Sequence, residues 1–328
     1  MEQLKKFFSF AWSHKGKLGV LAISTLVFAF LLFPFNDLSD FIGAQISKMS
    51  RNKVYVQFDQ LHMSLVPTPG VALENVQVEA QGLAGLKIQE AILTPGFSTL
   101  ITQKPAGTLT ARGFLNGDIQ VSLKSGARTD DGKERQEITI EAKKLSLGEL
   151  KQIGQLPFVA KGDLNLSSKA LIEPTLKTQP DVDVTLRIDQ FQPLSVQTPL
   201  GPFVLPELKI SNVELKGRLS AGKLIIEQGI IGKETDELRG TIKGSLDLQI
   251  IRPDPDSTVI IPQMGGYNFD VDLKVKKGFY ARASTIFSIA EGALRLNNHK
   301  IDSADGVQYR FKVQGANFID IPNVSALR

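Results

Sequence analysis

Residues 181–188 read DVDVTLRI and residues 269–275 read FDVDLKV, and both stretches place an apolar side chain at every second position. The apolar positions are Val182, Val184, Leu186 and Ile188 in the first stretch, and Phe269, Val271, Leu273 and Val275 in the second. Successive side chains of a β-strand point to opposite faces of its sheet. A period of two therefore predicts strands with one apolar face and one wet face.

The same alternation recurs along most of the chain. Further runs are Val54/Val56/Phe58, Leu61/Met63/Leu65, Ile119/Val121/Leu123, Ile138/Ile140, Leu164/Leu166, Leu246/Leu248/Ile250 and Tyr309/Phe311/Val313. The apolar phase shifts between Phe58 and Leu61, which predicts a bulge or sharp bend there. Pairs such as Asn116-Gly117 and Ala221-Gly222 lie between runs and are typical of hairpin turns. We therefore expect a mainly β domain of antiparallel strands over residues 53–328, with a weak division near residues 190–207.

Three stretches outside the β pattern have helical spacing. Residues 147–156 and 284–296 predict short helices that lie across a sheet. Residues 36–52 predict an amphipathic linker helix, since apolar residues recur there every three to four positions after a capping Asp37-Leu38-Ser39-Asp40 sequence. Its apolar face either packs onto the β domain, or lies on a membrane surface or a partner helix.

Residues 18–35, LGVLAISTLVFAFLLFPF, carry no charge. A helix of this length at about 1.5 Å per residue roughly matches the ~30 Å hydrocarbon core of a bilayer. A cleaved signal peptide is the competing interpretation, but no small-residue cleavage site follows the run. We predict a transmembrane anchor in which the main apolar residues are Leu18, Leu21, Ile23, Leu26, Phe28, Phe30, Leu32 and Phe33.

The charge distribution orients this anchor. Residues 1–17 form a basic tail with four lysines and one glutamate, which accounts for most of the formal net charge of +4. The positive-inside rule places this tail in the cytoplasm and the rest of the chain on the far side of the membrane. The nearly neutral remainder has no basic stripe interleaved with aromatic residues, so we expect no nucleic-acid partner.

The residues that usually carry chemistry are sparse. The chain has no cysteine, which excludes disulfides, thiolate zinc sites and cysteine nucleophiles. Its three histidines lie far apart without a ligand motif, and no G-x-S-x-G, Walker or G-x-G-x-x-G sequence is found. The pairs Asp181/Asp183 and Asp270/Asp272 fall on the wet side of predicted strands. We expect no catalytic residue, no metal and no cofactor, and we do not expect an enzyme.

Four segments resemble a known family in their order along the chain. They are residues 53–56 (KVYV) leading to 61–76 (LHMSLVPTPGVALENV), residues 147–150 (LGEL) leading to 162–166 (GDLNL), residues 222–226 (GKLII) leading to 240–248 (GTIKGSLDL), and residues 309–315 (YRFKVQG). Together they are similar to the type II secretion system protein N family, which is related to the AsmA-like periplasmic proteins.

The resemblance implies an elongated, strongly curved antiparallel sheet with an apolar groove behind an N-terminal transmembrane helix. It also implies an accessory subunit of type II protein secretion, anchored in the bacterial inner membrane with its C-terminal domain in the periplasm, that binds other envelope proteins of the system. The alternative that it implies is an AsmA-like lipid-binding or lipid-transfer protein, with phospholipid as the partner. The candidate groove or partner face is Val54, Val56, Phe58, Val182, Val184, Leu186, Ile188, Phe269, Val271 and Leu273.

Overall fold

The computed structural model describes residues 16–17, 20–21, 24–25, 28, 39–64, 69–80, 85–96, 104–128, 134–152, 158–173, 178–198, 201–204, 206–251, 261–293, 295–317 and 322–327. Within these residues the alternating sequence forms one antiparallel sheet of seventeen strands. The fold is therefore mainly β, as the period of two predicts.

The helices are few and short. They are α3 (Ser39–Met49), α5 (Lys277–Arg282) and α6 (Ser284–Ala293), with the 3-10 turns η2 (Glu149–Gln152) and η3 (Leu296–His299). The strands are β1 (Val54–Gln57), β2 (Gln60–Ser64), β3 (Gly70–Ala80), β4 (Leu86–Pro95), β5 (Gly107–Phe114), β6 (Gly117–Arg128), β7 (Glu134–Ser146), β8 (Phe158–Ile172), β9 (Asp181–Thr198), β10 (Gly201–Val204), β11 (Ile210–Ser220), β12 (Lys223–Ile231), β13 (Leu238–Ile251), β14 (Ile261–Lys276), β15 (Lys300–Ser303), β16 (Gly306–Gly315) and β17 (Asn323–Ala326).

The long strands pair in chain order. Strands β3 to β9 each pair with the next, β9 pairs with β11, β11 to β14 follow in turn, and β14 pairs with β16. Short strands complete the edges: β1 and β2 both pair with β3, and β15 and β17 both pair with β16. Since β9 runs through residues 190–198 and also pairs with β10, the sheet is continuous across the expected division.

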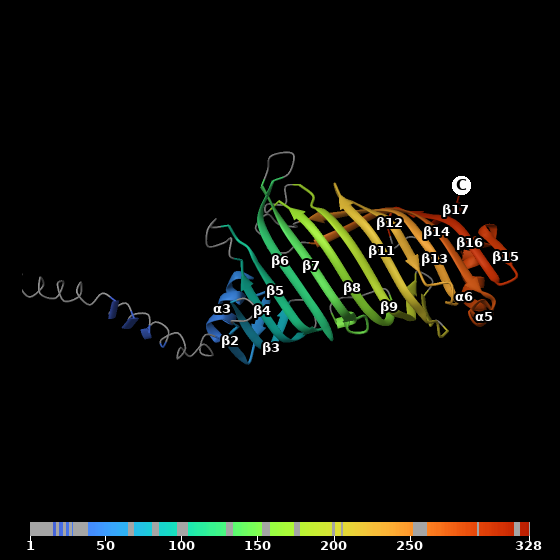
Figure 1. The fold of residues 1–328 in the computed structure, drawn as a ribbon. Helices are drawn as coiled ribbons and strands as arrows, with labels where there is room; N and C mark the ends of the chain where they lie inside the picture. The colour runs from blue at the N-terminus through green and yellow to red at the C-terminus, as the bar shows by residue number, and fades with distance from the viewer. Residues whose placement is uncertain are drawn as a thin grey trace, which may run out of the picture.

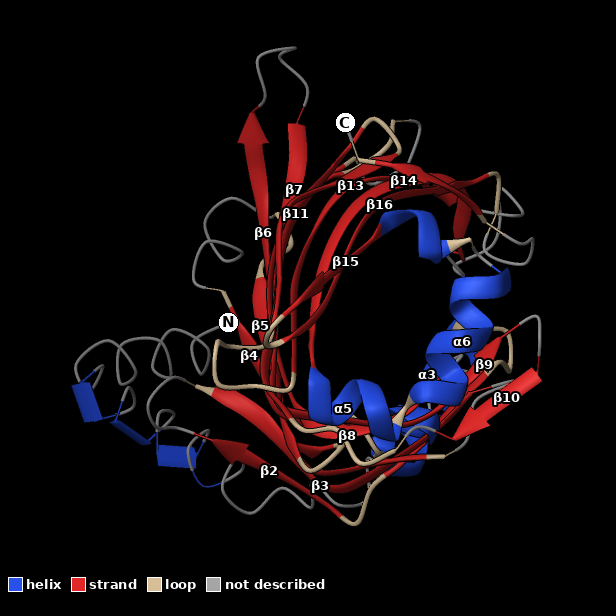
Figure 2. Cartoon of the chain, turned by 90° about the vertical axis from the view of Figure 1, so that its right-hand side faces the viewer, coloured by secondary structure: helices blue, strands red, loops and turns tan. Residues whose placement is uncertain are grey.

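The sheet is elongated and strongly curved. Figure 1 shows the strands following one another along the long axis, and Figure 2, viewed along that axis, shows the sheet bent around a central space. Helices α5 and α6 lie on the inner side of this curve (Figure 2). The curved antiparallel sheet with few helices therefore agrees with the expected fold class.

The bend expected after Phe58 is present. Strand β1 ends at Gln57 and β2 begins at Gln60, and the two strands pair with different ends of β3. The amide of Asn75, which has a φ of +51°, donates a 2.9 Å hydrogen bond to Asp59 at this point. The shift in apolar phase thus marks the place where the chain turns from β1 to β2.

Two expected helices differ in length from the sequence interpretation. In the stretch 147–156 the structure has one 3-10 turn, η2, and residues 153–157 lie outside the described part. Gly148 and Gly154 bracket this turn, and glycine disfavours a longer helix. Residues 284–296 divide into α6 and η3 at Arg295, which has a φ of +54°.

The segment 18–35 is described only in part. Val20, Leu21 and Phe28 are helical and exposed. The other main anchor positions lie outside the described residues; they are Leu18, Ile23, Leu26, Phe30, Leu32 and Phe33. In the part of the chain that the structure describes, no helix combines the length and apolar character needed to cross a membrane.

Candidate functional site

The register of the sheet joins mostly apolar positions of many strands into continuous rows. Directly paired residues of antiparallel strands lie on the same face, so a row can be followed from strand to strand. One row is Ala142, Leu166, Leu186, Leu215, Gly229, Ile242, Val271 and Phe311. The next row is Leu93, Leu109, Val121, Ile140, Ser168, Val184, Gly217, Ile226, Gly244, Phe269 and Val313. We call these two rows the concave face.

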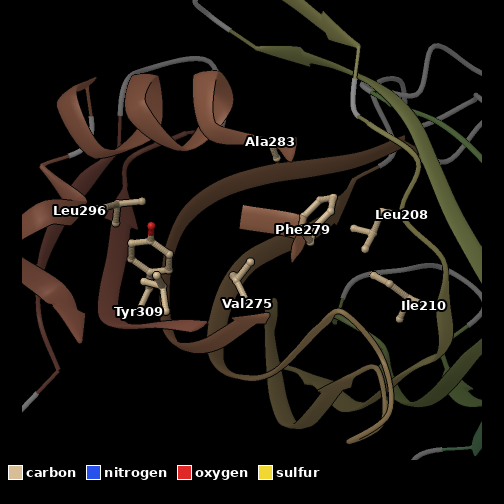
Figure 3. Close-up of a cluster of buried hydrophobic side chains, with 8 residues drawn as sticks. Leu208, Ile210, Val275, Phe279, Ala283, Leu296 and Tyr309 are labelled. Carbon is tan, nitrogen blue, oxygen red and sulfur yellow. The ribbon is translucent and has the colours of Figure 1, made fainter. Parts of the chain in front are cut away.

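Buried contacts show that the rows face the inside of the curve. Val275 lies on the same side of β14 as Val271, four residues away. It packs with Val307, Tyr309 and Phe279 of α5 in a buried cluster, whose members are drawn in Figure 3. Since α5 lies inside the curve in Figure 2, the side chains of the two rows point inward as well.

The concave face is open to solvent on β4 and β5. Leu93 and Leu109 are directly paired on β4 and β5, and they are 55% and 44% exposed. Further along the same row, Val184 and Phe269 are half-buried. A contiguous exposed apolar surface of this kind usually marks an interaction site in a soluble domain.

Both ends of the sheet carry helices. At the C-terminal end, α5, α6 and η3 cover β14 and β16, where Phe279 of α5 is only 2% exposed. At the N-terminal end, α3 packs on β1, with Gly43 so close that an added Cβ would lie 3.0 Å from the carbonyl oxygen of Val56. The open part of the concave face therefore lies between two helical ends (Figure 1).

A buried polar cluster fastens α6 to the sheet at the C-terminal end. The carboxylate of Glu291 accepts hydrogen bonds from Tyr309 at 2.5 Å and from Tyr280 at 3.1 Å, and Lys300 lies 3.3 Å away. Burial raises the pKa of Glu291, but the hydrogen bonds from Tyr309, Tyr280 and Lys300 outweigh it, so the net pKa is below its ordinary value. Hydrogen bonding to Tyr280 raises the pKa of Lys300. Both charges are therefore maintained at neutral pH.

The candidate residues named from sequence fall into two groups. The register places those of β9 and β14 on one shared surface, which they form with the residues paired to them; they are Val182, Val184, Leu186, Ile188, Phe269, Val271 and Leu273. Val54 and Val56 lie instead on β1 at the N-terminal end, where α3 packs, and Phe58 lies in the bend before β2. The ten residues thus do not form one compact site.

The paired aspartates lie on the other face of the sheet. Asp270 and Asp272 alternate with Phe269 and Val271, and each has a cationic partner on β16, with Lys312 at 3.4 Å from Asp270. Asp181 likewise forms a 3.0 Å ion pair with Arg135. Among the described residues, no group of three or more His, Cys, Asp or Glu side chains is arranged to hold a metal ion.

Two features of the site are missing from the sequence interpretation. Leu93 and Leu109 were not assigned to it, because their neighbours on the same face are small residues such as Ala91 and Ala111, which weaken the alternation. Glu291 was not recognised either. In the sequence, Glu291 is a single acidic residue next to Ala290 on the apolar side of a predicted helix. Such a position suggests a buried charge only when the residue that pairs with it is known, and the sequence does not show that residue.

Comparison of the chain with protein-family models, curated proteins and solved structures gives no match.

Proposed function

We propose that this protein binds the acyl chains of a lipid along its concave face while residues 18–35 hold it at the bacterial inner membrane, with the sheet in the periplasm. The observation that carries the proposal is the exposed apolar pair Leu93 and Leu109, which lies in a row of eleven paired positions that are apolar except for Ser168 and the glycines Gly217 and Gly244. Each CH₂ group of an acyl chain that leaves water on this face contributes about 0.8 kcal/mol. A long acyl chain can lie across many strands, so its CH₂ groups together contribute a large favourable free energy of binding.

The absence of charge on the concave face fits an apolar ligand. The two rows contain no ionisable side chain, whereas the charged residues of β14, Asp270 and Asp272, point to the opposite face. A charged ligand would find no ion-pair partner within the rows. The face therefore suits the hydrocarbon part of a lipid, and a headgroup would have to remain outside it.

Lipid content of the purified protein tests the proposal. The full-length protein is extracted in detergent and analysed by native mass spectrometry, beside the variants Leu93→Asp and Leu109→Asp. Both positions are half-exposed, so the fold should persist, which circular dichroism checks. The matched control is Ile225→Asp, which is 47% exposed on the opposite face. We expect bound phospholipid in the wild type and control and its loss in both concave-face variants; a lipid-free wild type refutes the proposal.

A second candidate is the accessory subunit of type II protein secretion that the sequence resemblance implies. In support of it, the sheet ends in short edge strands with exposed side chains, and Ile301 of β15 is 49% exposed. Such an edge offers backbone groups to a partner strand. The assay compares secretion of a type II substrate into the medium by strains with and without this chain. If deletion leaves secretion unaffected, this role is excluded. If the Leu109→Asp variant restores secretion to the deletion strain, the secretion role does not depend on lipid binding by the concave face.

A further inference from the structure

The helix α3 contacts the sheet at a glycine. Gly43 lies against the backbone of β1, and the Ser50 hydroxyl accepts a 3.0 Å hydrogen bond from the amide of Val54. Ser47 lies four residues from Gly43, so these two positions share one face of the helix, and Ser50 directly follows its last residue, Met49. The contact with the sheet therefore includes a residue without a side chain, and Ile42 and Ile46, which lie beside Gly43 and Ser47, are half-buried as well.

Two of the large apolar residues of α3 point away from the domain, whereas Ile42 and Ile46 are half-buried. Phe41 and Met49 are eight residues apart and lie on one face of the helix. They are 67% and 70% exposed, although α3 packs on β1. In a helix whose entire apolar surface packed onto its own domain, these two side chains would be buried together with Ile42 and Ile46, which are half-buried. Their exposure shows that the contact with β1 leaves this apolar surface unused.

A cluster of positive charge lies beside the exposed face. Lys48, Arg51 and Lys53 are all exposed, and residues 41–58 contain no aspartate or glutamate. Arg51 has a φ of +55°, a conformation that glycine adopts without the strain of a side chain. The arginine side chain is therefore present at a position where the backbone alone would favour glycine.

The position of α3 in the chain points to what meets this surface. The helix begins at Ser39, four residues after the apolar segment 18–35 ends, and four extended residues span at most about 14 Å. An apolar segment in a bilayer would therefore keep α3 close to the headgroups. Exposed apolar side chains flanked by lysine and arginine match an interface between acyl chains and anionic phosphates.

We infer that Phe41, Lys48, Met49, Arg51 and Lys53 form a membrane foot that contacts the anionic lipid headgroups of the leaflet in which the apolar segment ends. Phe41 and Met49 insert at the level of the headgroups, and the three cations bind lipid phosphates. The foot holds the N-terminal end of the sheet against the bilayer, so that the concave face begins at the membrane surface. This inference rests on the membrane anchoring in the proposed function, but not on lipid binding by the concave face.

Fluorescence of single-cysteine variants tests the foot, because the chain has no native cysteine. The full-length variants Met49→Cys, Phe28→Cys and Ile301→Cys are labelled with an environment-sensitive dye. They are reconstituted in nanodiscs of phosphatidylcholine with phosphatidylglycerol, and quenching by spin-labelled lipids is measured. We expect quenching at position 49 by headgroup-level spin labels, quenching at position 28 by mid-chain labels, and none at position 301, which is exposed at the opposite end of the sheet.

Charge removal then separates headgroup binding from simple proximity. The triple variant Lys48→Gln, Arg51→Gln, Lys53→Gln should lose most of the quenching at position 49 in discs with phosphatidylglycerol. The control is the triple variant Lys124→Gln, Lys161→Gln, Lys209→Gln, which removes three exposed lysines, on β6, on β8 and just before β11, and should keep the quenching. Equal quenching in discs of phosphatidylcholine alone would overturn the role of anionic lipid.

The remaining outcomes are distinct. An unquenched dye at position 49 with a quenched dye at position 28 overturns the foot and leaves the anchoring intact. A dye at position 49 that is shielded from water but not quenched by lipid means that a second copy of the chain covers the helix, which also overturns the inference. An unquenched dye at position 28 overturns the anchoring and the foot together. Phospholipid bound to the concave face is measured separately, in the detergent-extracted protein.

Discussion

The hydroxyl of Tyr309 on β16 donates a 2.5 Å hydrogen bond to the carboxylate of Glu291 on α6, and both side chains are buried. The aromatic ring of the same tyrosine stacks on Phe287 with ring centroids 5.9 Å apart. Tyr309 therefore holds α6 to the sheet by a polar and an apolar contact at once. This pair fixes the helical end of the concave face.

Removing the Tyr309 hydroxyl should destabilise the protein. Tyr309→Phe keeps the ring contact with Phe287 but leaves the buried carboxylate of Glu291 with one donor fewer, at an expected loss of about 1–3 kcal/mol in the free energy of unfolding. Chemical denaturation of the full-length protein in detergent measures this. Tyr55→Phe at a 50% exposed position is the matched control and should change little. Equal stability of the two variants would mean that the hydrogen bond contributes nothing.

The contribution of Glu291 should depend on pH in a defined direction. The folded-state pKa of Glu291 lies below its ordinary value of 4.5, so its charged form stabilises the fold above pH 4.5, and this stabilisation is lost as the pH falls through the folded-state value. The wild type should thus exceed Glu291→Gln in unfolding midpoint at neutral pH, and the difference should shrink in acid. A difference that grew in acid would contradict the assignment. Glu227→Gln, on the exposed surface of β12, is the control.

Gly244 should tolerate no side chain. Its φ is +149°, and an added Cβ would collide with the backbone oxygen of Asn268 on β14. Gly244→Ala should therefore lower the free energy of unfolding by about 1–3 kcal/mol. In contrast, Gly292 in α6 has open space around it, and Gly292→Ala should stabilise the protein by about 0.5–1 kcal/mol because alanine favours a helix. Thermal unfolding of both variants checks the opposite signs.

The sheet should lie on the periplasmic side of the inner membrane, because four lysines precede the apolar segment and no cleavage site follows it. Alkaline phosphatase fused after Gln60 should be active, and the same enzyme fused after Lys17 should be inactive. Mass measurement of the native protein should give the uncleaved chain. A product that begins just after residue 35 would show that the segment is a signal peptide.

The strands were predictable where apolar and charged residues alternate clearly along the sequence. In β9 and β14, apolar residues such as Val184 and Val271 alternate with charged ones such as Asp183 and Asp272, so local sequence determines both the strand and its inward face. Strands β4 and β5 were not predicted, because Ala91 and Ala111 give too little contrast. Their inward face becomes evident only from the register with β6.

The turns and the curvature depend on contacts that the sequence does not reveal. The pair Asn116-Gly117 suggested a turn at these two residues, but the positive φ angles fall on Leu115 and Asn116. Gly117 begins β6, where a Cβ would collide with the backbone oxygens of Lys143 and Lys144. The glycine is therefore needed for close packing of the neighbouring strand. Likewise, Tyr309 and Glu291 are eighteen residues apart, and only the folded sheet brings them together.

Because the long strands pair in chain order, the sheet can assemble in the direction in which the chain is made. A newly made strand finds its partner already in place, since the preceding hairpin has just folded. Each added strand closes only a short loop, so the entropy lost at each step is small, although the finished sheet is large. The exposed edge during such assembly is always the newest strand. The helices α5 and α6, which come near the end of the chain, cover the inner face only after nearly all of the sheet has formed.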